Sequence, residues 1–213
     1  MRYSTSGLGG YFRRRAILFL FLGMVMIMGA IAGALAARTL PQNQKSDLMG
    51  FLQGFFQTPH TGDPITPEEI ARQSIIDNVV KTTGLMWILG LSLIGSPLIV
   101  ALLFLRGFVI GFSVGFLVDQ MVYKGVALAA VAIVPHNLVI LPSVVVAAGA
   151  SLSFSLAAIR KLFGNGQENM YYQFLSTTLL CLMAALGLVG AAFIEGYITP
   201  TLIELARVYI FYG

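Results

Sequence analysis

Five ionisable residues that lie within or beside long apolar stretches are the first candidates for chemistry in this sequence: Arg106, Asp119, Lys124, His136 and Glu195. A charged side chain at membrane depth costs about 2.5–3.5 kcal/mol on insertion scales, so such a residue often marks a functional site. A proton or ion relay would need a chain of these groups along one path, and their spacing assembles none. The simplest interpretation places all five at the ends of apolar helices, where Arg106 and Lys124 reach the membrane surface. An Asp119–Lys124 pair is one way to satisfy a partly buried carboxylate.

Catalysis and metal binding find little support in the same residues. Hydrolysis inside a membrane needs a nucleophile with a base within hydrogen-bond reach, and His136 is the only plausible intramembrane base. The sequence contains no HExxH pair and no phosphate loop. Its GxSxG match at Gly111–Gly115 lies inside a predicted apolar helix, without the strand-to-helix turn of a nucleophile elbow. A structural metal needs several converging ligands, whereas the histidines are His60 and His136 and the single cysteine is Cys181. We therefore expect no enzyme activity, no metal and no cofactor.

The composition indicates that membrane helices must carry these residues. Of the 213 residues, 57% are hydrophobic and 10% are charged, whereas a soluble domain has about a quarter charged residues. Only a bilayer suits so much apolar surface on a chain of this size. The net charge of +4 does not indicate nucleic-acid binding, because the basic residues lie mainly at the ends of apolar runs, where they set orientation.

The predicted fold class is an all-α integral membrane protein with about five transmembrane helices, in a single polytopic domain over 1–213. A bilayer-spanning helix needs about 20 mostly apolar residues, and the first candidate is longer than the core of a signal peptide. The third candidate is either one tilted helix or a short span followed by a half-helix before the Pro135-His136 break. The predicted spans are 16–37, 84–105, 107–134, 138–159 and 172–194.

The distribution of lysine and arginine predicts the orientation of these spans. Clusters at Arg13 to Arg15 and at Arg160-Lys161 flank the first and fourth spans, and such clusters favour the cytoplasmic side. We therefore expect the N-terminus inside, the C-terminus outside, and both the loop 38–83 and the tail 195–213 facing outward.

The outward loop contains an amphipathic segment. Apolar residues recur there at helical spacing, namely Leu48, Phe51, Leu52, Phe55 and Phe56. Two interpretations remain open: this stripe lies in the outer headgroup layer, which we favour, or it packs onto a partner. Thr66, Pro67 and Glu69 then form a capping-box signature that predicts a helix start, and Thr199-Pro200 repeats the device in the tail.

Glycines and prolines predict how the helices pack. Gly107, Gly111 and Gly115 recur on one helical face, as do Gly29 and Gly33, and such faces allow helices to approach closely in lipid. They serve contact within one chain or the seam of a homodimer, and the sequence favours neither. Pro135 and Pro142 bracket His136-Asn137 and remove backbone donors, which predicts a buried, rigid corner.

Three segments of the sequence resemble the stage II sporulation protein M family. They are Arg106-Gly107-x-x-x-Gly111, Pro135-His136-Asn137-Leu138-x-x-x-Pro142, and the run from Ala191-Ala192-Phe193-Ile194-Glu195 to Gly196-Tyr197-Ile198-Thr199-Pro200. The length, the N-terminal arginines and the five-span pattern are similar as well. Many wider family members have Gly and Glu where this chain has Asn137 and Ile140, a departure that fits a scaffold better than a catalyst.

The resemblance implies a role in forespore engulfment during sporulation. The family's namesake anchors a complex with stage II sporulation proteins D and P, which cut peptidoglycan outside the membrane. This chain would then be a non-catalytic scaffold in the mother-cell engulfing membrane or septum, with membrane lipid and those proteins as partners. The alternative is a permease subunit of an export-type transporter, although the short inward segments leave little surface for an ATPase.

Overall fold

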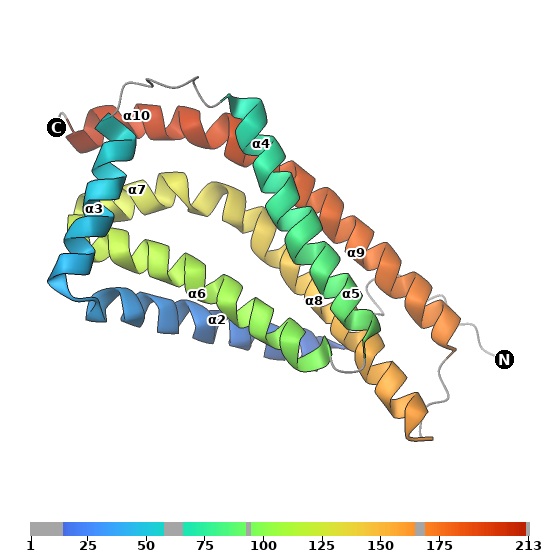
Figure 1. Ribbon diagram of the computed structural model, residues 1–213. Coiled ribbons are helices and arrows are strands. Elements are labelled where there is room, and N and C mark those ends of the chain that lie inside the picture. The colour runs from blue at the N-terminus through green and yellow to red at the C-terminus, as the bar shows by residue number, and fades with distance from the viewer. Residues whose placement is uncertain (1–14, 58–65, 93–94, 165–168, 212–213) are drawn as a thin grey trace.

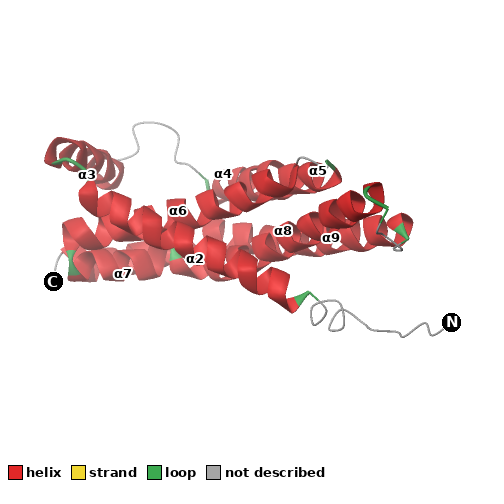
Figure 2. Ribbon diagram, turned by 90° about the horizontal axis from the view of Figure 1, so that it is seen from below, coloured by secondary structure: helices red, strands yellow, loops and turns green. Residues whose placement is uncertain are grey.

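The structure, a computed structural model, describes residues 15–57, 66–92, 95–164 and 169–211, and their regular structure is entirely helical. This confirms the all-α class, while Arg13, Arg14 and His60 lie outside the described residues. Figure 2 shows helices throughout the described residues, with α3 at one end of the bundle. The first elements are α2 (Ala16–Thr39), α3 (Gln42–Gln57), α4 (Pro67–Ile75), the π-helix η1 (Ile76–Gly84) and α5 (Leu85–Leu91). They are followed by α6 (Gly95–Met121), α7 (Tyr123–Ala132), α8 (Val134–Leu162), α9 (Met170–Phe193), the π-helix η2 (Ile194–Ile198) and α10 (Thr199–Phe211).

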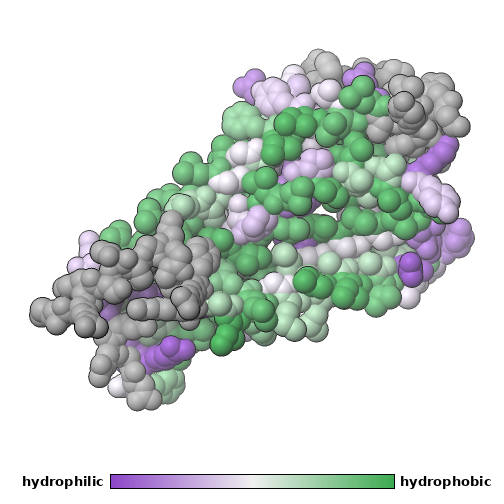
Figure 3. All heavy atoms as spheres, turned by 180° about the vertical axis from the view of Figure 1, so that it is seen from behind, coloured by the Kyte–Doolittle hydropathy of each residue, from purple (hydrophilic) through white to green (hydrophobic). Residues whose placement is uncertain are grey.

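Four helical segments of the described residues are long and apolar enough to cross a membrane. They are Ala16–Thr39, Gly95–Met121, Val134–Leu162 and Met170–Leu205, with hydropathies between 2.0 and 2.5. Much of their side-chain surface is exposed on the isolated chain, as at Ile17 and Leu186. Figure 3 shows a face that is mostly apolar, with hydrophilic residues gathered towards its two ends. The chain is therefore a multi-pass membrane protein.

The predicted span 84–105 does not correspond to one helix. The chain runs without interruption from α4 through η1 into α5, turns at Ser92, and begins α6 at Gly95. Ser155 on α8 donates a hydrogen bond to the Ser92 carbonyl, at 3.0 Å, and Gly95 is needed because a methyl group there would overlap the Leu89 carbonyl. Hydropathy missed this turn because Ser92 and Gly95 lie inside one continuous apolar run of the sequence.

Two further boundaries differ from the predicted ones. The predicted span 107–134 is divided, since α6 ends at Met121 and the short helix α7 follows; this is the half-helix that the sequence left as an alternative. The last predicted span, 172–194, is not followed by a separate tail, because α9 continues through η2 into α10. Thr199-Pro200 does mark the start of α10, but this start lies inside a continuous helix, where the Thr199 hydroxyl donates to the Ile194 carbonyl.

Helices α2 and α6 form the most extensive helix pair of the described residues, and glycines line their contact. A methyl group at Gly29 would overlap the Phe104 carbonyl, and one at Gly33 would overlap the Phe108 carbonyl. Because the residue numbers rise together along the contact, the two helices run parallel. Likewise Gly107, Gly111 and Gly115 lie against the α2 residues Met26, Ala30 and Ala34. The glycine faces therefore meet within one chain and give no support to a homodimer seam; a homodimer through another face stays a prediction.

Helix α8 is the centre of the second part of the bundle. Figure 1 shows α5, α8 and α9 side by side, and α8 contacts both neighbours. Its inner positions form much of the buried apolar core, including Ile140, Val144 and Ala147. Helix α8 follows directly from α7, so its first turn lies between the α2–α6 pair and the group formed by α5, α8 and α9. Most of the polar residues that the sequence predicted as candidates lie at this junction.

Candidate functional site

Three of the five ionisable candidates line one cavity of about 940 Å³ between the helices: Arg106, His136 and Glu195. They come from α6, α8 and η2, and polar residues of α4 and η1 complete the walls. Polar groups at this depth in a membrane bundle are costly and often functional. The structure therefore brings together residues that the sequence analysis treated as separate helix ends.

Arg106 corrects the expectation that it lies at a span end and reaches the membrane surface. It lies midway along α6, partly buried, and its Nη2 donates a hydrogen bond to Asn78 Oδ1. The side chain does not need to extend to the headgroups because the α4–η1–α5 helix covers this face of α6 and supplies a polar partner. Glu195 likewise lies in the middle of a continuous helix, not at its end.

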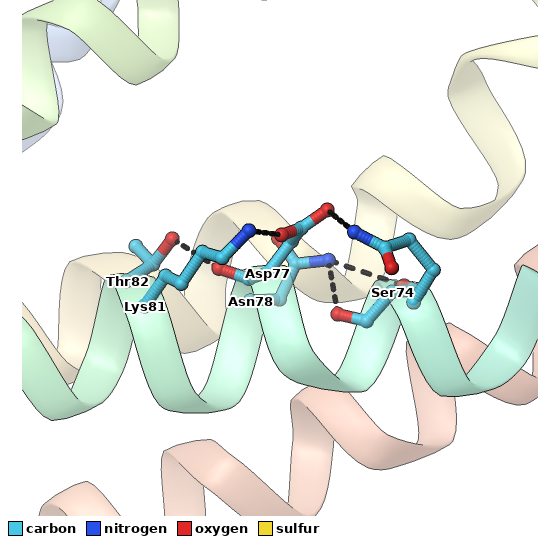
Figure 4. A network of polar contacts seen from close by, with 6 residues as sticks. Ser74, Asp77, Asn78, Lys81 and Thr82 are labelled. Atoms are coloured by element: carbon cyan, nitrogen blue, oxygen red, sulfur yellow. Dashed lines mark hydrogen bonds and ion pairs between the residues drawn. The ribbon is translucent and has the colours of Figure 1, made fainter.

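A chain of hydrogen bonds connects Arg106 to Glu195. Asn78, which accepts from Arg106, donates from its Nδ2 to the Oγ of Ser74 at 3.1 Å, and Ser74 Oγ donates to Glu195 Oε2 at 2.6 Å. Figure 4 shows Asn78 reaching back along its helix to Ser74. Both linking residues are buried. A cation on α6 is thus joined to an anion on η2 through side chains that the sequence analysis did not single out.

Both π-helical segments position members of this chain. Asn78 lies in η1 and Glu195 in η2, and π-helical turns are rare and occur frequently at functional sites. Thr83 donates to the Asn78 carbonyl and Thr199 to the Ile194 carbonyl, each at 3.2 Å and five residues back. These hydroxyls bond to carbonyl groups at the widened turns. A threonine five residues after each bonded carbonyl is the sequence signal that could have located the π-helical turns.

Gly196 allows the two segments to approach. A methyl group at this position would lie 2.6 Å from the Pro67 carbonyl oxygen and 2.9 Å from the Ala71 methyl. Pro67 and Ala71 belong to α4, whose start is fixed by the predicted capping box between Thr66 and Glu69. The close contact between α4 and η2 is what places Ser74 beside Glu195.

His136 and Asn137 lie at the predicted corner between α7 and α8. Pro135 is in the first turn of α8 and Asn137 is buried. The Asn137 Nδ2 donates to the Ile133 carbonyl at 2.8 Å, which fixes its amide group, and lies 3.0 Å from His136 Nε2. In the neutral ring, Nε2 is then the acceptor and Nδ1 carries the hydrogen. Pro142 lies inside α8 and Pro200 in the first turn of α10.

Two buried donors in the cavity walls have no hydrogen-bond partner among the described residues: Arg106 Nε and His136 Nδ1. A buried polar group without a partner costs about 1–3 kcal/mol, so such groups are rare in folded proteins. Both unpartnered atoms carry hydrogens, so the partner that would satisfy each of them is a hydrogen-bond acceptor.

Asp77 lies beside the buried chain, at the more exposed side of the cavity. Its carboxylate accepts a hydrogen bond from Lys81 at 2.6 Å and another from Gln73 at 2.9 Å. The Lys81 hydrogen bond, followed by that of Gln73, lowers the pKa of Asp77, which lies outside the four apolar spans. This carboxylate is therefore already satisfied.

Asp119 pairs with Lys45 instead of the expected Lys124. The Lys45 Nζ lies 2.7 Å from Asp119 Oδ2 and also donates to the Arg38 carbonyl, while Lys124 is exposed. Lys124 is only five residues from Asp119 in the sequence, which favoured it as the partner. The helix is interrupted between them at Val122, however, where φ is 48°, and this separates the two side chains. The ion pair instead fastens α3 to the end of α6.

Helix α3 carries the predicted amphipathic stripe. Phe51 is 81% exposed and Leu48 is 37% exposed on the isolated chain, whereas the side chains of Leu52, Phe55 and Phe56 lie outside the described part of the structure. The helix therefore presents apolar side chains away from the bundle, as either interpretation of the stripe requires.

Within the described ranges, no three of the His, Cys, Asp and Glu side chains lie together in a way that could hold a metal ion.

Comparison with known proteins gives one match. The family model described as Stage II sporulation protein M matches residues 18–200, a range that contains every residue of the cavity. No curated protein and no solved structure matches the chain.

Proposed function

The chain belongs to the stage II sporulation protein M family, and from this premise we propose that it is a non-catalytic membrane scaffold that positions peptidoglycan-degrading enzymes during forespore engulfment. The proposed partners are stage II sporulation proteins D and P. The proposed orientation has the N-terminus in the cytoplasm and α3 outside, because basic clusters at Arg15 and at Arg160-Lys161 favour the inner side.

The observation that carries this proposal is the attachment of α3. Its apolar residue Phe51 is exposed, while the buried Lys45 ties the helix to Asp119 at the end of α6. An amphipathic helix that is held at a fixed place beside the spans suits a docking element for a partner that works next to the membrane. An interfacial helix that only contacts headgroups has less need of a partly buried ion pair to hold it in place.

Co-purification tests this role. The full chain, solubilised in detergent, is mixed with the D and P proteins, and we expect both to be retained. Phe51→Ser should reduce retention at least several-fold, because truncating an exposed apolar contact at an interface removes binding energy. Phe163→Ser is the matched control, since Phe163 is 77% exposed at the end of α8. Equal retention by the two variants would count against α3 as the docking element, and no retention by the unchanged protein would count against the scaffold.

A permease subunit is the second candidate, and the polar cavity is the observation that favours it. Arg106, His136 and Glu195 lie within apolar helices, where ionisable groups often line a substrate path. Uptake of a solute by proteoliposomes containing the protein and an ATPase that co-purifies with it would reverse the ranking of the two candidates.

A further inference from the structure

The cavity between α4, α6, α8 and η2 is lined by two unpartnered donors and by the Glu195 carboxylate. Arg106 Nε and His136 Nδ1 are buried N–H groups without a partner among the described residues. The hydrogen position on His136 follows from Asn137, whose Nδ2 occupies the other ring nitrogen. Two unpartnered donors on neighbouring walls favour an oxyanion, since a planar guanidinium binds carboxylates and phosphates well.

A simple anion does not fit the whole site. The Glu195 carboxylate interacts electrostatically with both Arg106 and His136, so it would repel a second negative charge. The other charged residues in the lining, Glu69, Arg72 and Asp77, give no net positive charge. Asp77 is neutralised by Lys81.

Glu195 has acceptor capacity left for a cationic group. A carboxylate offers about four lone-pair sites, and Ser74 occupies one of them through Oε2. The inner part of the cavity therefore combines one cation, one carboxylate and a neutral donor. Its volume of about 940 Å³ lies within the range of small-molecule sites.

We propose that this cavity binds a zwitterion with an oxyanion and a primary ammonium group, as in the headgroup of phosphatidylethanolamine. The oxyanion accepts from Arg106 and His136, and the ammonium donates to Glu195. The same chemistry comes from a bilayer lipid or from a free headgroup compound. The inference stands apart from the scaffold and permease proposals, because it is measured without a partner protein and without transport.

Thermal unfolding of the delipidated full chain in detergent tests the proposal. The probes are phosphatidylethanolamine, phosphatidylglycerol and phosphatidylcholine with the same acyl chains, together with soluble glycerophosphoethanolamine. We expect phosphatidylethanolamine to raise the melting temperature by about 2–4 °C or more. Phosphatidylglycerol lacks the ammonium and phosphatidylcholine lacks its N–H donors, so both should give smaller shifts. A shift with the soluble compound identifies the headgroup as sufficient, and a shift with the lipid alone identifies the bilayer as the source; either result supports the site.

Two variants and two matched controls locate the binding. Arg106→Gln and Glu195→Gln should each lose most of the phosphatidylethanolamine shift. Arg160→Gln and Glu204→Gln change the same charges at exposed positions and should keep it. Equal shifts with all three lipids, or a full shift in Arg106→Gln and Glu195→Gln, would overturn the proposal. If a variant does not fold, the comparison of headgroups on the unchanged protein decides alone.

Discussion

Ser74 donates a hydrogen bond to Glu195 with 2.6 Å between Oγ and Oε2, although the two residues are 121 positions apart in the chain. The contact links α4 to the π-helical turn between α9 and α10. It also completes the chain of hydrogen bonds from Arg106 through Asn78.

Ser74→Ala should destabilise the protein by about 1–3 kcal/mol, because it leaves a partly buried carboxylate and the Asn78 amide without their hydroxyl partner. Denaturant unfolding in detergent measures the loss. Ser113→Ala is the control: Ser113 also lines the cavity, but its hydroxyl bonds a carbonyl of its own helix, at Val109. A Ser74→Ala variant as stable as the Ser113→Ala variant would show that the contact contributes little.

Gly111→Ala should destabilise the protein by about 1–3 kcal/mol, the usual cost of overpacking, because the added methyl overlaps the Ala30 carbonyl. Gly23→Ala is the control, since nothing lies within 4 Å of a methyl group there. Removing a glycine from a helix interior stabilises by about 0.5–1 kcal/mol, so the two variants should change the melting temperature in opposite directions. Changes of the melting temperature with the same sign in both variants would contradict the close packing of α2 on α6 at Gly111.

Lys45→Ala should loosen α3 without unfolding the bundle. The free energy that holds α3 against the bundle should fall by less than the roughly 3–5 kcal/mol lost when a fully buried ion pair is broken, because the Asp119 side chain is 27% exposed. Hydrogen exchange of the backbone amides over 42–57 measures it, with faster exchange there and unchanged exchange in α8.

The matched control for this pair is Lys124→Ala, which removes the same charge from an exposed residue near Asp119 in sequence. We expect no change in the exchange of α3 for that variant. If Lys124→Ala loosens α3 as much as Lys45→Ala does, the effect comes from net charge and not from the contact.

Thr66→Ala should destabilise the first turn of α4 by about 1 kcal/mol, since Thr66 Oγ1 accepts from the Glu69 amide in the capping box. The measurement is hydrogen exchange of the first amides of α4. Thr201→Ala provides the comparison, because the exposed Thr201 hydroxyl bonds a carbonyl four residues back within a helix. Exchange at α4 that is unaffected by Thr66→Ala would mean that the contact with η2 alone holds this helix start.

Local patterns predicted several elements of this fold. Long apolar runs predicted membrane helices, Thr66 and Glu69 predicted a capped helix start, and the residues around His136 predicted a corner. Each of these depends on neighbours within a few residues or on hydropathy averaged along one helix. The three segments that carry the family resemblance contain Arg106, His136 and Glu195, but no local pattern indicates that these residues share a cavity.

The sequence alone determined that this is an all-helical membrane protein, because transfer of apolar side chains from water depends on composition and length. It also determined membership of the stage II sporulation protein M family. The tertiary structure decided where its charges go. The turn at Ser92 carries no hydropathy signal, yet it folds α6 back along the helix that carries Ser74 and Asn78, so that Asn78 meets Arg106. Arg106 therefore meets partners inside the bundle instead of water at its edge, since a buried charge is stable only where distant segments supply its hydrogen bonds.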